Sequence, residues 1–168
     1  MATPTEATTR AFVLRTHKAG DLGWIVHRHG KLYAEEHGYD ERFEGIVAGI
    51  AGEFLRRHDP LRERCWIAEM DGKIAGCVML VKATDDTARL RLMLVEPEAR
   101  NHGIAAALMR ELLEFARGAG YRKIVLWTHT NLEAARRLYE RTGFRLAHTE
   151  GVEDFGRAVT AETWELTL

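Results

Sequence analysis

The segment from Leu90 to Ala105, LRLMLVEPEARNHGIA, constrains the fold more than any other part of this sequence. It joins an apolar run to a turn, and then to an arginine- and glycine-containing loop that opens a helix. Pro97 fixes its own φ and biases Glu96 away from the helical region, so the strand ends there. Gly103 lacks a Cβ, which lets a ligand approach the backbone. Because the first amides of a helix have no partner within it, this junction suits an anion such as a pyrophosphate.

The same segment excludes two common nucleotide-binding motifs. No Lys-Ser or Lys-Thr pair follows Gly103, so the Walker pattern is absent, and the three glycines of the dinucleotide fingerprint are absent too. The pattern from Leu90 to Thr128 predicts a strand, a helix and a second strand, which implies a parallel crossover.

Two blocks of the sequence, in order, resemble one known family. Arg100 to Ala105, RNHGIA, resembles the R/Q-x-x-G-x-G/A loop of the GNAT superfamily of acyl-CoA-dependent N-acyltransferases. Asn131 to Phe144 resembles that superfamily's N-x-x-A-x-x-x-Y-x-x-x-G-F block. The resemblance covers roughly residues 68–168 and is closest to the acetyltransferase half of bacterial proteins that fuse a winged-helix regulator to such a domain. No winged-helix segment is recognised in this sequence.

The patterning and the resemblance together imply a mixed α/β (α+β) fold. We expect a single twisted, mostly antiparallel central sheet with a parallel, splayed strand pair and about four flanking helices. The chain has 168 residues, close to the ~150 expected of one domain. We therefore expect a single acetyltransferase domain over residues 11–168, preceded by a flexible N-terminus over residues 1–10.

Periodicity and turn signals place the individual elements. Asp21 is a candidate N-cap, and Asp71-Gly72 is a strong hairpin signal. Helices are expected at residues 21–37, 41–57, 104–117 and 131–142, and strands at 12–15, 65–70, 73–81, 87–95, 123–128, 144–149 and 160–168.

Composition excludes several classes of protein. The formal net charge of −1 gives no electrostatic reason to expect a nucleic-acid partner. No apolar run approaches the ~20 residues that span a bilayer, and the N-terminus lacks a secretion signal, so a cytoplasmic protein without a membrane partner is expected. Cys65 and Cys77 form no CxxC motif and are expected to be buried free thiols. No metal site is expected.

The resemblance implies acetyl-CoA as co-substrate. It assigns the pantetheine arm to backbone groups at the end of the strand, and the pyrophosphate to the amides of the following loop. Each assignment has a structural alternative, namely a buried strand, an ordinary helix entry or solvated charges. The cofactor-binding residues so implied are Met93, Leu94, Val95, Arg100, Asn101, His102, Gly103, Ile104, Ala105, Ala106 and Asn131.

The resemblance also assigns a catalytic role to Tyr139, which would protonate the departing CoA thiolate. A tyrosine with an unperturbed pKa near ~10 is protonated at neutral pH and can donate. The alternative is an aromatic side chain that packs at a helix–strand joint.

The sequence departs from the family where a histidine or glutamate often serves as general base, because Arg89 and Arg91 stand there. Arginine cannot accept the proton, but its planar fork suits a carboxylate. The alternative is that both arginines pair with nearby acids, for which Asp85, Asp86 and Glu69 are candidates. Replacement bases are sought on the first helix, at Glu35, Glu36, His27 and His29. The expected substrate-binding residues are Trp24, Tyr33, Glu36, Arg89 and Arg91, although Trp24 and Tyr33 suit core packing equally well.

We therefore expect an N-acetyltransferase in which the amine attacks acetyl-CoA directly, with a small carboxylated amine or amino acid as acceptor. The first alternative is a non-catalytic acyl-CoA-binding sensor, which the missing base keeps open. The second, a nucleic-acid-binding regulator, is disfavoured by the charge. The resemblance also implies that the chain can form a homodimer.

Overall fold

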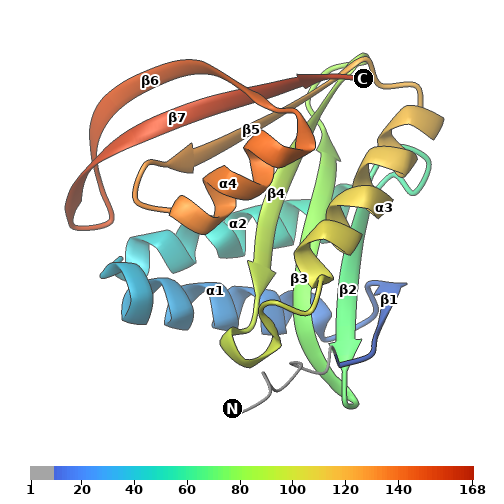
Figure 1. The fold of residues 1–168 in the computed structure, drawn as a ribbon, viewed down its shortest axis with the longest axis horizontal. Helices are drawn as coiled ribbons and strands as arrows, with labels where there is room; N and C mark the ends of the chain where they lie inside the picture. The colour runs from blue at the N-terminus through green and yellow to red at the C-terminus, as the bar shows by residue number, and fades with distance from the viewer. Residues whose placement is uncertain (1–9) are drawn as a thin grey trace, which may run out of the picture.

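The computed structural model describes residues 10–168 and shows one sheet flanked by helices (Figure 1). The flexible N-terminus expected over residues 1–10 lies outside the described residues, apart from Arg10. In chain order the elements are β1 (Phe12–Thr16), α1 (Asp21–His37), α2 (Glu41–Arg57), β2 (Arg64–Met70), β3 (Lys73–Lys82), β4 (Thr87–Val95), the 3-10 helix η1 (Pro97–Ala99), α3 (Ile104–Gly118), β5 (Lys123–His129), α4 (Glu133–Thr142), β6 (Arg145–Asp154) and β7 (Arg157–Thr167).

The sheet has seven strands in the order β1-β2-β3-β4-β5-β7-β6. Every neighbouring pair is antiparallel except β4 and β5, which are parallel and joined through α3. The predicted mixed α/β fold with one parallel pair is therefore confirmed. None of the helices in the described part of the chain is long and apolar enough to cross a membrane.

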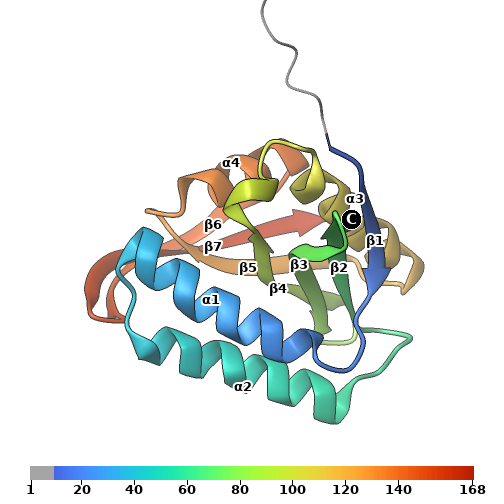
Figure 2. The same ribbon diagram turned by 90° about the horizontal axis from the view of Figure 1, so that it is seen from below.

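The helices form a layer on each side of the sheet (Figure 2). Helices α1 and α2 cover one face, and α3 and α4 cover the other. Side chains of β3 alternate between the two cores, as strand geometry requires, with Cys77 and Met79 toward α1 and α2, and Val78 and Leu80 toward α3. Cys65 and Cys77 are buried free thiols, as predicted.

The last two strands are longer than the sequence predicts. Strand β6 runs on to Asp154, and β7 already begins at Arg157. Nearly all side chains of β6 are exposed, so its sequence lacks the apolar alternation that marks a half-buried strand. The turn places Phe155 at φ 55° and Gly156 at φ 82°. Phe155 is buried, and its carbonyl accepts the Asp40 N–H at 3.0 Å, so the hairpin turn packs on the loop after α1.

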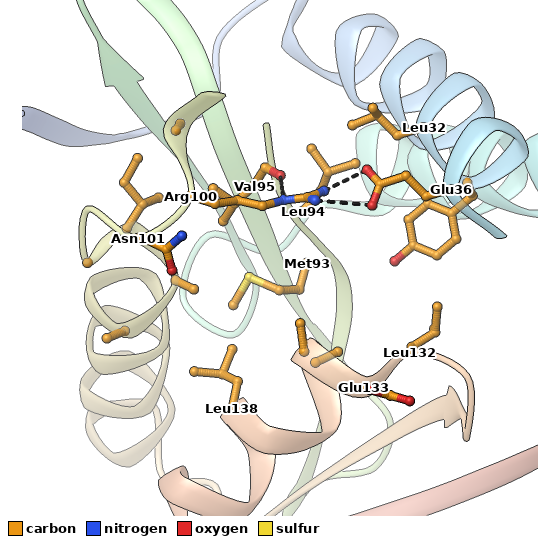
Figure 3. A pocket seen from close by; sticks show the side chains of 18 of the residues that line it. Leu32, Glu36, Met93, Leu94, Val95, Arg100, Asn101, Leu132, Glu133 and Leu138 are labelled. Carbon is orange, nitrogen blue, oxygen red and sulfur yellow. Dashed lines mark hydrogen bonds and ion pairs between the residues drawn. The ribbon is translucent and has the colours of Figure 1, made fainter. Parts of the chain in front are cut away.

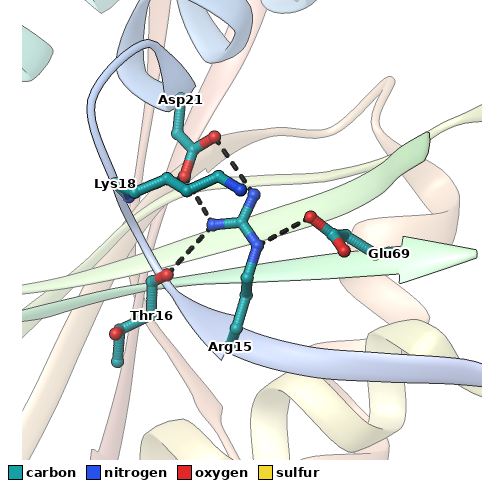
Figure 4. Close-up of polar contacts among 5 residues, drawn as sticks. All are labelled: Arg15, Thr16, Lys18, Asp21 and Glu69. Carbon is teal, nitrogen blue, oxygen red and sulfur yellow. Dashed lines mark hydrogen bonds and ion pairs between the residues drawn. The ribbon is translucent and has the colours of Figure 1, made fainter. Parts of the chain in front are cut away.

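A partly buried ion pair fixes the start of α1 to the sheet (Figure 4). Gly20 occupies the N-cap position and Asp21 is the first helical residue, so the expected Asp21 N-cap is corrected by one position. The Asp21 carboxylate accepts the Lys18 N–H at 2.7 Å and Nη1 of Arg15 at 2.6 Å. Arg15 also donates Nε–H to Glu69 at 2.7 Å, which links β1, β2 and α1.

We predict that Asp21→Asn lowers the free energy of unfolding by about 3 kcal/mol at pH 7, because it removes a buried carboxylate charge and leaves the Arg15 guanidinium with Glu69 as its remaining partner. Burial by itself raises the pKa of Asp21, but the hydrogen bonds from Arg15 and Lys18 outweigh it and the pKa lies below its usual value. This stability is present above the unfolded-state pKa of about 3.9 and is lost as the pH falls through the lower folded-state pKa.

Urea unfolding at several pH values measures the effect. The matched control is Asp85→Asn, which removes an exposed pair with Lys82 and should change stability by less than about 1 kcal/mol. Equal losses in the two variants, or a loss for Asp21→Asn that persists unchanged at pH 2, would contradict the prediction.

Candidate functional site

The site is built where β4 separates from β5. The two strands pair only at Thr87↔Lys123, Ala88↔Ile124 and Arg89↔Val125, and no pair follows along the described residues of either strand. Opposite this edge the register between β3 and β4 shifts, and Leu92 takes a φ of 54°. A positive φ in a non-glycine residue of a strand is strained and marks a bulge at a functional position. The end of β4 therefore presents an unpaired backbone edge.

A cavity of about 430 Å³ lies beside this edge (Figure 3). It is bounded by the end of α1, the end of β4, the loop into α3 and the start of α4. Met93, Leu94 and Val95 line it, as the sequence predicts. Its other lining residues are Leu32, Tyr33, Glu36, His37, Ala99, Arg100, Asn101, Gly103, Ile104, Ala105, Ala106, Leu132, Glu133, Ala134, Ala135, Leu138 and Arg141.

The start of α3 provides free amides at one end of this cavity. Gly103 is the N-cap residue at φ 86°, without a side-chain cap, and Asn101 is at φ 64°. Within residues 10–168, no acceptor is recorded for the amides of residues 101–106, whereas Ala107 N–H bonds the Gly103 carbonyl. Unsatisfied amides at the positive end of a helix favour a bound anion. The residues here fit a pyrophosphate.

Arg100 connects the helix layer to β4 across the rim of the cavity (Figure 3). Its Nη2 and Nη1 donate to Glu36 at 2.7 and 3.1 Å, and its Nε donates to the Val95 carbonyl at 3.2 Å. The hydrogen bond from Arg100 lowers the pKa of Glu36. Glu36 thus lines the larger cavity as a paired carboxylate, which makes it a poor candidate for the missing base.

A second, smaller cavity of about 110 Å³ adjoins the first and shares Tyr33, Met93, Leu132 and Ala135 with it. It lies between α1, α2 and the diverging ends of β4 and β5, and its walls are mostly aromatic and aliphatic. Its other lining residues are His29, Tyr39, Phe43, Ile46, Val47, Ile50, Leu90, Arg91, Leu92, Trp127, Thr128, His129, Tyr139 and Phe155.

Tyr139 belongs to the wall of the second cavity. Its side chain packs against Phe144, and its hydroxyl has no hydrogen-bond partner among residues 10–168. Burial raises the pKa of Tyr139, so the hydroxyl remains protonated at neutral pH. The packing alternative is therefore confirmed for the ring, while the role of the hydroxyl as proton donor stays a prediction.

Arg91 lines the second cavity, but Arg89 lines neither. The expected alternative, that these arginines pair with nearby acids, is wrong for the described chain. Neither arginine has an ion pair there, because Asp85 pairs with Lys82, and Glu69 pairs with Arg15. Burial, and secondarily the charge of Arg89, lower the pKa of Arg91. An unpaired, partly buried guanidinium favours an anionic ligand.

Several predicted site residues lie outside both cavities. Trp24 packs in the core beneath α1 and α2, which confirms its structural alternative. Asn131 bonds the Tyr39 hydroxyl, and His102 accepts the Arg10 N–H at 3.0 Å. Among the candidate bases, His27 and Glu35 are exposed and line neither cavity.

His29 is the base candidate that reaches the second cavity. Its Nδ1 lies 2.8 Å from the Ile25 carbonyl, so Nδ1 carries the proton, and its buried Nε2 has no partner among the described residues. Burial lowers the pKa of His29 to about 4.

Four residues of the second cavity could not be predicted from the sequence. These residues come from the loop after α1, from α2, from the end of β5 and from the turn between β6 and β7. No local spacing links them, because only the packing of the hairpin turn on the α1–α2 loop brings them together. They are Tyr39, Phe43, His129 and Phe155.

Comparison of this chain with known proteins agrees with this geometry. The family model described as Acetyltransferase (GNAT) family matches residues 23–144. N-acetylaspartate synthetase from Danio rerio is 42% identical over 81 residues, which are 48% of this chain and 29% of that protein. The probable N-acetyltransferase camello from Xenopus tropicalis is 32% identical over 122 residues, 71% of this chain and 54% of that protein. The chain thus spans between about a third and a half of the length of these relatives.

A solved structure shows the same fold. It is yncA, a putative acetyltransferase from Salmonella typhimurium with its cofactor acetyl-CoA, which superposes with a TM-score of 0.75 and covers 94% of each chain at 18% identity. No group of side chains in the described part of the chain is arranged to hold a metal ion.

We predict that Gly103→Glu lowers the affinity for coenzyme A at least roughly ten-fold, because a carboxylate would stand at the free amides of α3. A Cβ at this position meets no atom within 4 Å, so the protein should still fold. The matched control is Gly120→Glu, since Gly120 has a φ of 87° and equally open surroundings at the other end of α3. Titration calorimetry measures both affinities. Equal affinities of the two variants for coenzyme A would show that the loop before α3 does not take part in binding.

Proposed function

The chain belongs to the acetyltransferase (GNAT) family, and on that premise we propose that it transfers the acetyl group of acetyl-CoA to the primary amine of a small, carboxylate-bearing acceptor. The observation that carries the acceptor class is Arg91, a partly buried guanidinium in the second cavity without an acidic partner in the described chain.

The larger cavity supplies the residues that would hold acetyl-CoA. The free amides at the start of α3 suit its pyrophosphate, and the unpaired edge of β4 at Met93, Leu94 and Val95 suits its pantetheine arm. When bound, acetyl-CoA supplies an activated thioester. The shared wall of the two cavities, with Tyr33 and Met93, is where the acetyl group and the acceptor would meet.

The chain's own groups support direct attack by the amine. Amides at the end of β4 are available to polarise the thioester carbonyl, and the protonated Tyr139 is available to donate to the departing thiolate. A covalent enzyme intermediate on cysteine is disfavoured. Burial raises the pKa of Cys65 to about 12 and that of Cys77 well above its usual value, so both stay as unreactive thiols.

The second cavity restricts the acceptor. Its volume of about 110 Å³ is far below the 300 Å³ or so at which drug-sized ligand pockets begin. The fixed charge of Arg91 would repel a polycation and hold a carboxylate. One relative carries the name N-acetylaspartate synthetase, and its name describes an amino acid acetylated on nitrogen, which is consistent with this class.

We predict that L-amino acids are better acceptors than spermine or an aminoglycoside in an assay of thiol release from acetyl-CoA. Arg91→Ala should raise the KM of the amino acid roughly 10- to 100-fold, the loss of one charge-assisted hydrogen bond, and should leave the KM of acetyl-CoA within about two-fold. Arg122→Ala, which removes an exposed arginine outside both cavities, is the control. If spermine is the best acceptor, the proposed acceptor class is wrong, although the proposed acetyl transfer still holds.

We also predict that Tyr139→Phe lowers kcat about 100-fold or more and keeps the affinity for coenzyme A, because only the donated proton is removed. Steady-state kinetics and calorimetry measure the two quantities. A variant with full kcat would reduce Tyr139 to a packing residue. Binding of coenzyme A by the wild type without thiol release from acetyl-CoA for any acceptor would instead favour the sensor alternative.

A further inference from the structure

The proposed reaction needs a group that takes a proton from the acceptor's ammonium. Neither Arg89 nor Arg91 can do so, and Glu36 is held by Arg100. A chain of polar side chains that the proposed function does not yet use begins at Tyr39 and His129 in the wall of the second cavity and continues to Asp154 behind it. It consists of Tyr39, His129 and Asp154, contributed by the α1–α2 loop, the end of β5 and the end of β6.

The three side chains lead from the cavity toward solvent. Tyr39 and His129 both line the cavity and are only 3% and 1% exposed. The Tyr39 hydroxyl lies 2.6 Å from Nδ1 of His129, and Nε2 of His129 lies 3.4 Å from Oδ2 of Asp154, within ion-pair distance but without hydrogen-bond geometry. The Asp154 side chain is 31% exposed. The chain thus connects the buried wall of the cavity to a partly exposed carboxylate.

The contacts around the hydroxyl indicate where its proton lies. Asn131 donates Nδ2–H to the Tyr39 oxygen at 3.2 Å, a shorter contact than the 3.4 Å from that oxygen to the Asn131 carbonyl oxygen. The hydroxyl proton is then donated to Nδ1 of His129, and Nε2 carries the imidazole proton toward Asp154. One lone pair of the Tyr39 oxygen remains for a proton from the cavity.

We propose that Tyr39, His129 and Asp154 form the proton relay that deprotonates the acceptor amine. The ammonium gives a proton to the Tyr39 oxygen while the hydroxyl proton moves to Nδ1 of His129. The Nε2 proton passes to Asp154 and then to water, and the freed nitrogen lone pair attacks the thioester carbonyl. Tyr39 contacts the acceptor, while His129 and Asp154 act through it. This relay rests on the proposed function.

The electrostatics of the three groups agree with a relay. Burial lowers the pKa of His129 although Asp154 opposes the effect, so the imidazole is neutral at pH 7 and able to accept. Burial raises the pKa of Tyr39, so the hydroxyl passes a proton on rather than ionising. Tyr39 and Asp154 are the titratable groups that face the imidazole among residues 10–168, and Trp127 and Phe155 supply its aromatic contacts.

His29 is a weaker candidate for the same role. His29 also lines the cavity, but its Nδ1–H is held by the Ile25 carbonyl, and no carboxylate in the described chain pairs with its ring. A proton taken there would remain in the core beside Tyr33 and Phe43, without a path to water.

The first test compares Tyr39→Phe with Tyr121→Phe, using thiol release from acetyl-CoA with a panel of L-amino acids. Tyr121 is also buried, and its hydroxyl donates to the Arg62 carbonyl at 2.8 Å, whereas that of Tyr39 contacts both His129 and Asn131; Tyr121 lies outside both cavities. We expect Tyr39→Phe to lower kcat about 100-fold or more at pH 7, with the KM of acetyl-CoA unchanged, and Tyr121→Phe to keep its rate. Asp154→Asn changes a partly exposed side chain and, like Tyr39→Phe, should lower kcat.

The pH profile separates a relay from a merely structural role. The deficit of Tyr39→Phe should shrink as the pH approaches the pKa of the acceptor's ammonium, because the amine then arrives neutral. A deficit that is constant with pH, or full activity of Tyr39→Phe, would overturn the relay and leave the acetyltransferase proposal intact. If His29→Gln loses all activity while Tyr39→Phe keeps the normal rate, the role of base belongs to His29 instead. A wild type that releases no thiol with any amino acid would overturn both proposals.

A second measurement needs no acceptor and no variant. In protein labelled with ¹⁵N-histidine, NMR reports which ring nitrogen of His129 carries the proton. The relay requires the Nε2–H tautomer with Nδ1 accepting from Tyr39. An Nδ1–H tautomer would overturn it.

Discussion

The separation of β4 from β5 is the constraint on which the rest of the site depends. Parallel strands normally pair along their length, but here pairing stops at Arg89 and Val125. The bulge at Leu92 turns β4 away, and Gly76 permits the close approach on its other side, because a Cβ there would lie 2.8 Å from the Leu94 carbonyl oxygen. The backbone edge so exposed has polar groups without partners in the sheet, and these are available to a bound ligand.

Ion pairs across elements hold the walls of this opening in place. Arg28 on α1 donates Nη2–H to Glu96 at the end of β4 at 2.8 Å, and Arg136 on α4 donates Nε–H to the buried Glu162 of β7 at 2.7 Å. Breaking such a pair strands a buried charge, which is far costlier than losing a surface pair. The two helices beside the cavities are therefore pinned to the strands they border. Arg91 differs from these paired groups because it has no ion pair among the described residues, and this difference supports the proposed acceptor class.

The sequence predicts the lining of the larger cavity far better than that of the second cavity. The stretch from Leu90 to Ala105 carries its information locally, since a strand, a proline turn and a left-handed Gly103 form one continuous segment. Tyr139 is likewise placed by a contiguous block. The second cavity depends on Phe155, which reaches Tyr39 only because an exposed polar hairpin turns at that point. Neither periodicity nor spacing encodes that contact. Trp24 shows the converse. It lies on α1, the helix expected to border the acceptor site, but its side chain packs against the core.

Mapping of backbone amide chemical shifts during a titration with coenzyme A tests the central claim most directly. The account predicts that the largest shifts fall on the amides of residues 93–95 and 101–106, where the structure records the unpaired strand edge and the uncapped helix start. Pantetheine, which lacks the pyrophosphate, should shift the amide signals of residues 93–95 and leave those of residues 101–106 nearly unchanged. Shifts confined to β1, β2 or the exposed β6 edge, or a loop 101–106 that responds equally to both compounds, would contradict it.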